Sequence, residues 1–308
     1  MHLHHEPFKS RLMKFFSLNL LKWKLLFQAL PFAIGILLIK LVLINVFNFQ
    51  GSLDINEIRL IFTSGVFLIG FMLAGTLSDY KESEKIPGEI ATALETIEET
   101  SVALGIKTNG HIKEIRLQVL EMSLMIHNWL YRKQTEKDVH KKLSEYNQTI
   151  HALEAAGGAP PIVGRLLIRL GDLRQLVTRT NVISKTGFLG TGYALLELLI
   201  VIVSALLLMT DFKSLGASEL AIIVIIELIY VYMYMLILDI DDPFEYEEDR
   251  AKGIAEVTLF PIENYIDRLR ERLAEGEAKN ETKEEETSKK EKNIKLTKKT
   301  RPKSARPV

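Results

Sequence analysis

The chain has 308 residues, of which 47% are hydrophobic and 25% charged, and its formal net charge is +0. This combination is typical of a protein in which apolar blocks alternate with charged ones. The sequence contains no cysteine, which excludes disulfides, thiolate metal sites and cysteine nucleophiles. Phosphate-binding, zinc-protease and serine-hydrolase motifs are also absent. We therefore expect neither an enzyme nor a nucleic-acid-binding protein.

The first quarter of the chain has the pattern of a membrane-embedded segment. Residues 1–24 form a basic amphipathic segment that mixes lysine and arginine with phenylalanine, leucine and tryptophan, which suits the inner membrane surface. Residues 25–79 hold two apolar runs, Leu25 to Phe47 and Arg59 to Asp79, which predict a first transmembrane hairpin. The connection between these runs has no lysine. Because positive charge favours the inner side of a membrane, we expect the N-terminus to be cytoplasmic.

Residues 80–186 form a polar insert between the two apolar parts of the chain. Apolar residues recur in it three to five positions apart, which is the spacing of amphipathic helices. We predict a cytosolic helical insert with no strands. Its four helices are expected at Lys81 to Leu104, Ile112 to Tyr131, Glu136 to Leu153 and Arg165 to Ile183.

Residues 187–239 hold two further apolar runs, which predict a second transmembrane hairpin. Residues 240–275 read as a cytosolic acidic turn followed by an amphipathic helix from Ala255 to Leu273, and residues 276–308 as a disordered basic tail. The fold class is therefore all-α: a four-span helical membrane protein with two hairpins and a cytosolic helical body. We expect a multi-pass protein of the plasma (inner) membrane with both termini in the cytoplasm.

The second apolar run differs from an ordinary leucine-rich anchor. No charge lies between Arg59 and Asp79, and the run carries several glycines and hydroxyl residues beside its phenylalanines. Small residues allow close helix approach, and hydroxyls can bond to the helix backbone. We hypothesise that this helix lines a pore; the alternative is a tightly packed membrane helix that lines nothing. The predicted pore-lining residues are Thr63, Phe67, Gly70, Phe71 and Thr76.

Three ionisable residues, Lys40, Glu197 and Glu227, fall inside predicted spans. A charge at that depth is costly, so each should face protein or water rather than lipid. Lys40 and Glu227 have comparable depth, and we predict that they pair if the first and fourth spans are neighbours. For Glu197 three states stay open: protonated, bonded to Tyr193, or exposed to a wet cavity.

A run of carboxylates follows the fourth span, and it includes Asp242, Glu247, Glu248 and Asp249. Such oxygen ligands are the kind that Ca²⁺ prefers, although their spacing does not match an EF-hand loop. The alternative is a solvated acidic turn that caps the next helix.

Two short motifs resemble the bestrophin superfamily, and specifically its prokaryotic bestrophin-like members. Phe67-Leu68-Ile69-Gly70-Phe71 resembles the Phe-x-x-Gly-Phe element of the bestrophin second span. Asp242-Pro243-Phe244-Glu245 resembles the Asn-Pro-Phe-Gly sequence that precedes the family's acidic cluster. The order of hairpin, helical insert and hairpin matches over roughly residues 20–275. The chain departs from the family in lacking a Trp-rich stretch at 79–85 and in having Glu245 where the family has glycine.

The resemblance implies a homopentamer in the lipid bilayer with the second span of each copy around a central pore. Phe67 and Phe71, with Thr63 above them, would form a hydrophobic neck for inorganic ions. The implied function is a bestrophin-like oligomeric ion channel that conducts anions such as chloride, with Ca²⁺ as the one cofactor considered. The alternative is a non-conducting membrane scaffold or sensor whose cytosolic helices bind a partner.

Overall fold

The computed structural model describes residues 23–49, 51–108, 111–186, 190–211, 217–247, 250–251 and 255–277. The predicted amphipathic N-terminus before residue 23 and the predicted tail beyond residue 277 lie outside this part of the chain. The chain divides into two compact units. The first comprises residues up to Ile86 together with Thr178–Thr258, and the second comprises Pro87–Val177 together with residues from Leu259 onward.

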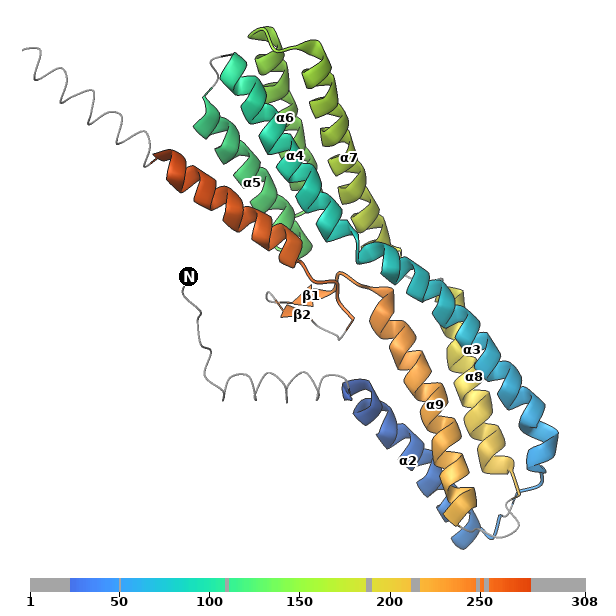
Figure 1. Ribbon diagram of the computed structural model, residues 1–308. Helices are drawn as coiled ribbons and strands as arrows, with labels where there is room; N and C mark the ends of the chain where they lie inside the picture. Colours follow the sequence, from blue (N-terminus) through green and yellow to red (C-terminus); the bar gives the residue numbers. More distant parts are fainter. Residues whose placement is uncertain are drawn as a thin grey trace, which may run out of the picture. The chain divides into compact units, whose positions relative to one another are not determined.

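Four long apolar helices dominate the first unit, and each is long and apolar enough to cross a membrane. They are α2 (Lys24–Asn45), α3 (Ile55–Ser83), α8 (Gly190–Met209) and α9 (Ala217–Asp241) (Figure 1). At 1.5 Å of rise per residue, 20 residues match the roughly 30 Å hydrocarbon core of a bilayer. The prediction of an all-helical protein with four spans is confirmed. The described strands are the two-residue β1 (Tyr246–Glu247) and β2 (Arg250–Ala251), which pair antiparallel.

Helix α3 extends beyond the predicted span at both ends. It starts at Ile55 because Asp54 and Glu57 form a capping box, in which the Asp54 backbone N–H donates to Glu57 Oε2 at 3.3 Å. The Asp54 side chain also accepts from the Asn56 backbone N–H at 2.8 Å. The helix ends at Ser83, and α4 (Ile86–Lys107) follows after a two-residue break. The prediction of a single helix from Lys81 to Leu104 was therefore wrong at its start, because Lys81 belongs to α3. Pro87 lies in the first turn of α4, where its missing N–H costs no helical hydrogen bond.

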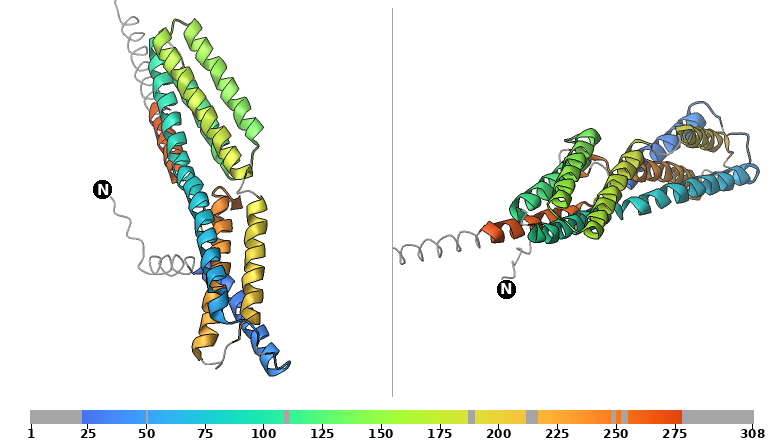
Figure 2. Two further views of the ribbon diagram at one scale, coloured as in Figure 1. Left: turned by 90° about the vertical axis from the view of Figure 1, so that its right-hand side faces the viewer. Right: turned by 90° about the horizontal axis from the view of Figure 1, so that it is seen from above.

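Helix α9 is the common neighbour of the other three spans, since α2, α3 and α8 all pack against it. Figure 1 draws α8 (yellow) between α9 (orange) and α3 (blue), whereas Figure 2, turned by 90°, shows α3 running alongside α9. The helix α2 packs more closely on α9 than on α3, which follows it in the chain. The apolar core of this unit lies between three of the helices and is formed by Ile58, Phe62, Ile69, Met72, Leu196, Val203, Leu207, Tyr230 and Ile237.

The second unit is a helical body. It contains α4 after Ile86, α5 (Ile112–Leu130), α6 (Glu136–Ala155), α7 (Pro160–Lys185) as far as Val177, and a helix over residues 260–277. The predicted insert helices are present, with shifted ends. Helix α7 starts five residues before Arg165 because proline is favoured in the first turn of a helix.

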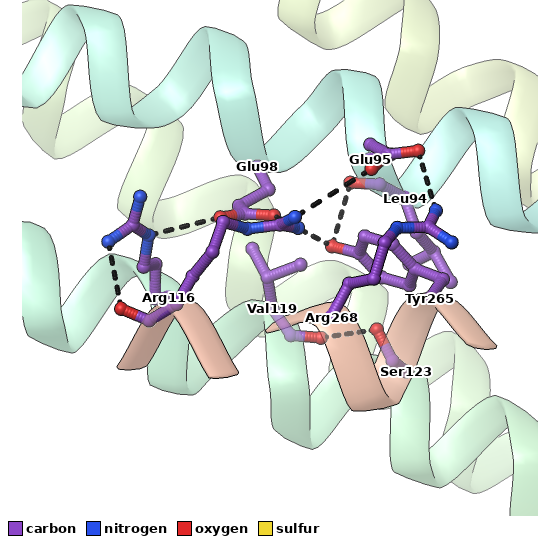
Figure 3. Close-up of polar contacts among 9 residues, drawn as sticks. Leu94, Glu95, Glu98, Arg116, Val119, Ser123, Tyr265 and Arg268 are labelled. Atoms are coloured by element: carbon purple, nitrogen blue, oxygen red, sulfur yellow. Dashed lines mark hydrogen bonds and ion pairs between the residues drawn. The ribbon is translucent and has the colours of Figure 1, made fainter. Parts of the chain in front are cut away.

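A buried carboxylate attaches the helix of residues 260–277 to this body. Glu98 on α4 is 1% exposed, and it accepts hydrogen bonds from Arg116 Nε at 3.0 Å and Arg272 Nε at 3.1 Å. Figure 3 shows Glu98 between Arg116 and Tyr265, whose hydroxyl lies 3.3 Å from the Leu94 carbonyl and 3.4 Å from Glu98 Oε2. Burial, and then the charge of Glu98, raise the pKa of Tyr265, so its phenol stays a donor. Arg268 adds a further pair with Glu95 at 3.0 Å.

We predict that Glu98→Ala lowers the free energy of unfolding by about 3 kcal/mol, because it leaves two arginines without their buried partner. The matched control is Glu121→Ala, which removes an exposed carboxylate that Lys142 contacts at 2.6 Å and should cost less than about 1 kcal/mol. Thermal unfolding of the purified protein measures both. Equal losses for the two variants would contradict this role for Glu98.

Candidate functional site

One face of α3 is left uncovered by the described chain. Phe67 and Phe71 are 77% and 73% exposed, and Leu60 is 75% exposed. Helical spacing places exposed Ser64, Ala74 and Ser78 on the same stripe. The opposite face of the helix packs into the core of the first unit through Ile58, Phe62, Ile69 and Met72. One face of α3 therefore packs against other helices of the same chain, and the opposite face, the free face, is left uncovered by the described residues.

The free face of α3 can be compared with the exposed faces of the other spans. Although Gln28 and Glu197 are exposed there as well, the exposed faces of those helices carry large apolar side chains, as expected for contact with lipid tails: Phe27, Phe32, Leu38, Leu195, Leu198, Val201, Ile222 and Ile225. The free face of α3 combines its two phenylalanines with exposed Thr63, Ser64 and Gly75. Small and hydroxyl residues are typical of surfaces that meet another helix or water. The composition of this face is therefore compatible with contact to another helix or to water.

The structure separates the five residues predicted to line a pore. Thr63, Phe67 and Phe71 share the exposed face, and Gly70 is half-buried at its flank. Thr76 does not belong with them: it is 3% exposed, and its hydroxyl donates to the Leu73 carbonyl at 3.1 Å. Nine residues separate Thr76 from Phe67, which is half a turn beyond two full turns and puts the two on opposite sides of α3.

The predicted pore-lining set left out Ser64, Ala74 and Ser78, which lie on the phenylalanine face. Ala74 and Ser78 are exposed there, seven and eleven residues after Phe67. Both spacings return close to the starting direction on an α-helix. The 3.6-residue period was the signal that could have found them.

Lys40 does not form the predicted pair with Glu227. Its amine is fully buried and donates to the carbonyls of Leu208 and Thr210, each at 2.7 Å. These carbonyls lie at the C-terminal end of α8, where helical carbonyls have no partner within the helix and attract a cation. The expected proximity of α2 and α9 is present, but the lysine turns to α8 instead.

Glu227 is 2% exposed and lies between α9 and α8. The Ser204 Oγ atom is 2.8 Å from Glu227 Oε1 and 2.9 Å from the carbonyl oxygen of Ile200. A hydroxyl has one hydrogen to donate, so it can serve only one of these two acceptors. Both contacts are satisfied when Glu227 carries a proton and donates to Ser204. A neutral carboxyl also suits the remaining oxygen, Oε2, which has no hydrogen-bond partner among the described residues.

Glu197, the third ionisable residue of the spans, pairs with a tyrosine of α9. The Tyr234 hydroxyl donates to Glu197 Oε1 at 2.8 Å. Tyr193, considered from the sequence, is therefore not the tyrosine that binds this carboxylate in the structure. The contact joins α8 to α9 at the exposed surface of the first unit.

Most of the predicted Ca²⁺ ligands lie outside the part of the chain that the structure describes. Glu248, Asp249 and the side chain of Glu247 are not described, whereas Asp242 Oδ1 accepts a hydrogen bond from the Phe244 backbone N–H at 3.3 Å. Across the described ranges, no three histidine, cysteine or acidic side chains lie close enough together to hold a metal ion. The Ca²⁺ site stays a prediction.

The fold and this site define a class: a four-span helical membrane protein with a helical body and an uncovered, aromatic span face. Comparison with solved structures identifies the fold as that of bacterial bestrophin homologs. A bestrophin homolog from Klebsiella pneumoniae superposes with a TM-score of 0.66 at 15% identity, covering 80% of this chain and 97% of that one. A structure described as a membrane protein gives 0.67 at 14% identity, covering 80% and 98%. No family model and no curated protein matches the sequence.

We predict that the infrared spectrum of the protein contains the C=O stretching band of a protonated carboxylic acid and that Glu227→Gln removes it. The amide of glutamine supplies the same hydrogen to Ser204, so this variant should fold normally. Glu145→Gln, at a half-exposed carboxylate of the second unit, is the control and should leave the band unchanged. A spectrum without such a band, or a band that survives Glu227→Gln, would show that Glu227 is ionised.

Proposed function

We propose that this protein is an oligomeric ion channel of the bestrophin type, in which α3 of each copy faces a central pore and Phe67 and Phe71 form its neck. The observation that carries the proposal is the free face of α3, which no described part of the chain covers. Aromatic rings beside small and hydroxyl side chains on a span suit a narrow, partly wetted passage. The likeness in fold to bestrophin homologs supports the same function.

A pore of this kind needs several copies, because one helix face cannot enclose a passage. Identical copies close most readily as a ring around an axis, and the resemblance to bestrophins favours five. In such a ring the lipid-like faces of α2, α8 and α9 are available to the bilayer, and the free face of α3 turns to the axis. We place both termini and the helical body in the cytoplasm, beneath the plasma membrane, from the basic N-terminal segment.

We further propose that the channel conducts anions. The exposed face of α3 carries no charged side chain between Arg59 and Asp79, so selectivity at the neck depends on the phenylalanines. Ring edges are weakly positive and can favour a partly dehydrated anion. The same rings form a hydrophobic constriction that closes when water leaves it.

We predict that the double variant Phe67→Ala, Phe71→Ala increases conductance several-fold, because removal of both rings widens the neck. Purified protein in planar lipid bilayers gives the measurement. The matched control is Phe32→Ala, a similarly exposed phenylalanine of α2, which should leave conductance unchanged. Unchanged currents in the double variant would refute the neck. A wild-type protein that passes no current would favour the non-conducting scaffold.

We predict that, in asymmetric potassium chloride, the reversal potential of the wild-type channel lies near the equilibrium potential of chloride. The physical reason is the absence of charge on the exposed face and the positive edges of its rings. A reversal potential near that of potassium would refute the anion preference and leave the channel itself standing. Potassium gluconate in place of chloride serves as the control for permeation by the anion.

A further inference from the structure

A single contact between α3 and α9 fixes the helix that carries the neck. Tyr230 of α9 is 1% exposed, and its hydroxyl donates to the backbone carbonyl of Phe62 on α3 at 2.5 Å. A hydroxyl within a span needs such a partner, because neither lipid nor apolar side chains offer a hydrogen-bond acceptor. The bond therefore ties α9 to the backbone of α3 at a defined height.

Gly65 makes this approach possible. A Cβ atom at position 65 would lie 2.5 Å from the Tyr230 hydroxyl oxygen and 3.0 Å from its ring carbon Cε1. Real Cβ atoms essentially never come so close to another heavy atom. Any larger residue at position 65 would push the tyrosine from the Phe62 carbonyl or rotate α3 away from it.

Side-chain packing leaves room for such a rotation. A groove of about 280 Å³ lies directly beside the contact, lined by Phe62, Thr63, Val66, Ile226, Ile229 and Tyr230. Tightly packed neighbours would hold a helix at one angle by themselves. Beside this groove, the hydrogen bond and the close fit at Gly65 supply that restraint.

The contact lies on the side of α3 opposite the neck. Phe67 follows Gly65 by two residues, or about 200° around the helix. Phe62 and Gly65 face α9, whereas Phe67 is 77% exposed on the other side. A turn of α3 about its own axis at this level therefore moves the Phe67 ring sideways, away from any pore axis.

We propose that Tyr230, seated on Gly65, is a positioning residue that sets the rotation of α3 and so aims the neck phenylalanines at the pore axis. The role rests on the proposed channel function. The carboxylate-bound Tyr234, one turn further along α9, bonds to Glu197 of α8 instead. It offers a matched tyrosine that lacks this role.

The chain has no cysteine, so a thiol introduced by Phe67→Cys is a clean reporter in the full-length protein. Its reaction with a charged, membrane-impermeant methanethiosulfonate in liposomes measures exposure to pore water. We expect the thiol to react in the otherwise wild-type protein. Addition of Tyr230→Phe, which removes one oxygen atom, should slow the reaction about fivefold, in line with the loss of one typical hydrogen bond. Addition of Tyr234→Phe should not change the rate.

Gly65→Ala provides a second, independent disturbance of the same contact. It should slow the reaction at position 67 at least as much as Tyr230→Phe does. When Gly65→Ala and Tyr230→Phe are combined, the reaction should slow by less than the two single effects multiplied together. The reason is that loss of the Tyr230 oxygen relieves the closest clash with the new Cβ atom. A role limited to stability predicts lower yields and no change in the rate.

The outcomes separate this inference from the proposed function. A thiol at position 67 that reacts equally fast in all backgrounds leaves the pore in place and overturns the positioning role. A thiol that never reacts with the charged reagent overturns the pore, and with it the role of Tyr230. Slowing by Tyr230→Phe but not by Tyr234→Phe supports both.

Discussion

The apolar interior of a membrane dictates how the four spans of this protein meet. A polar group placed there must find its partner in the protein, because lipid offers none. The buried amine of Lys40 takes the terminal carbonyls of α8, and the hydroxyl of Tyr230 takes a backbone carbonyl of α3. The carboxyl of Glu227 meets Ser204. Each of these bonds joins two different helices, and two of the three involve α9. Each polar group would be costly to bury in the membrane without a partner. Together these groups thus specify which helices pack against one another and at which level along their axes.

The same constraint explains why α3 has two different faces. Its inner face is apolar and includes Gly65, where the tyrosine of α9 approaches the backbone. Its outer face carries phenylalanine rings beside hydroxyl groups, and nothing in the described chain covers it. The Thr63 hydroxyl of this face donates to the Arg59 carbonyl of its own helix at 2.9 Å. The channel proposal rests on this uncovered combination of aromatic rings and small residues.

The helical body follows a different rule, since water surrounds it. There the decisive polar group is Glu98, a buried carboxylate held by arginines from α5 and from the helix of residues 260–277. Such a network is costly to break and demands exact geometry from every member. It fixes the C-terminal helix to α4 and α5, although more than 150 residues separate the interacting positions in the chain.

The sequence by itself determined the four spans, the helical insert and the shared face of Phe67 and Phe71, because hydropathy and helical spacing are local properties. Helix ends were less well predicted: the start of α3 depends on the capping box at Asp54, and α7 begins at Pro160. Helical spacing alone separates Thr76 from Phe67, but only the tertiary structure decided which of these two faces of α3 is buried and that Lys40 binds α8 instead of Glu227. Those outcomes depend on how helices are rotated and staggered against one another, and that arrangement results from packing between distant segments, which no local pattern records.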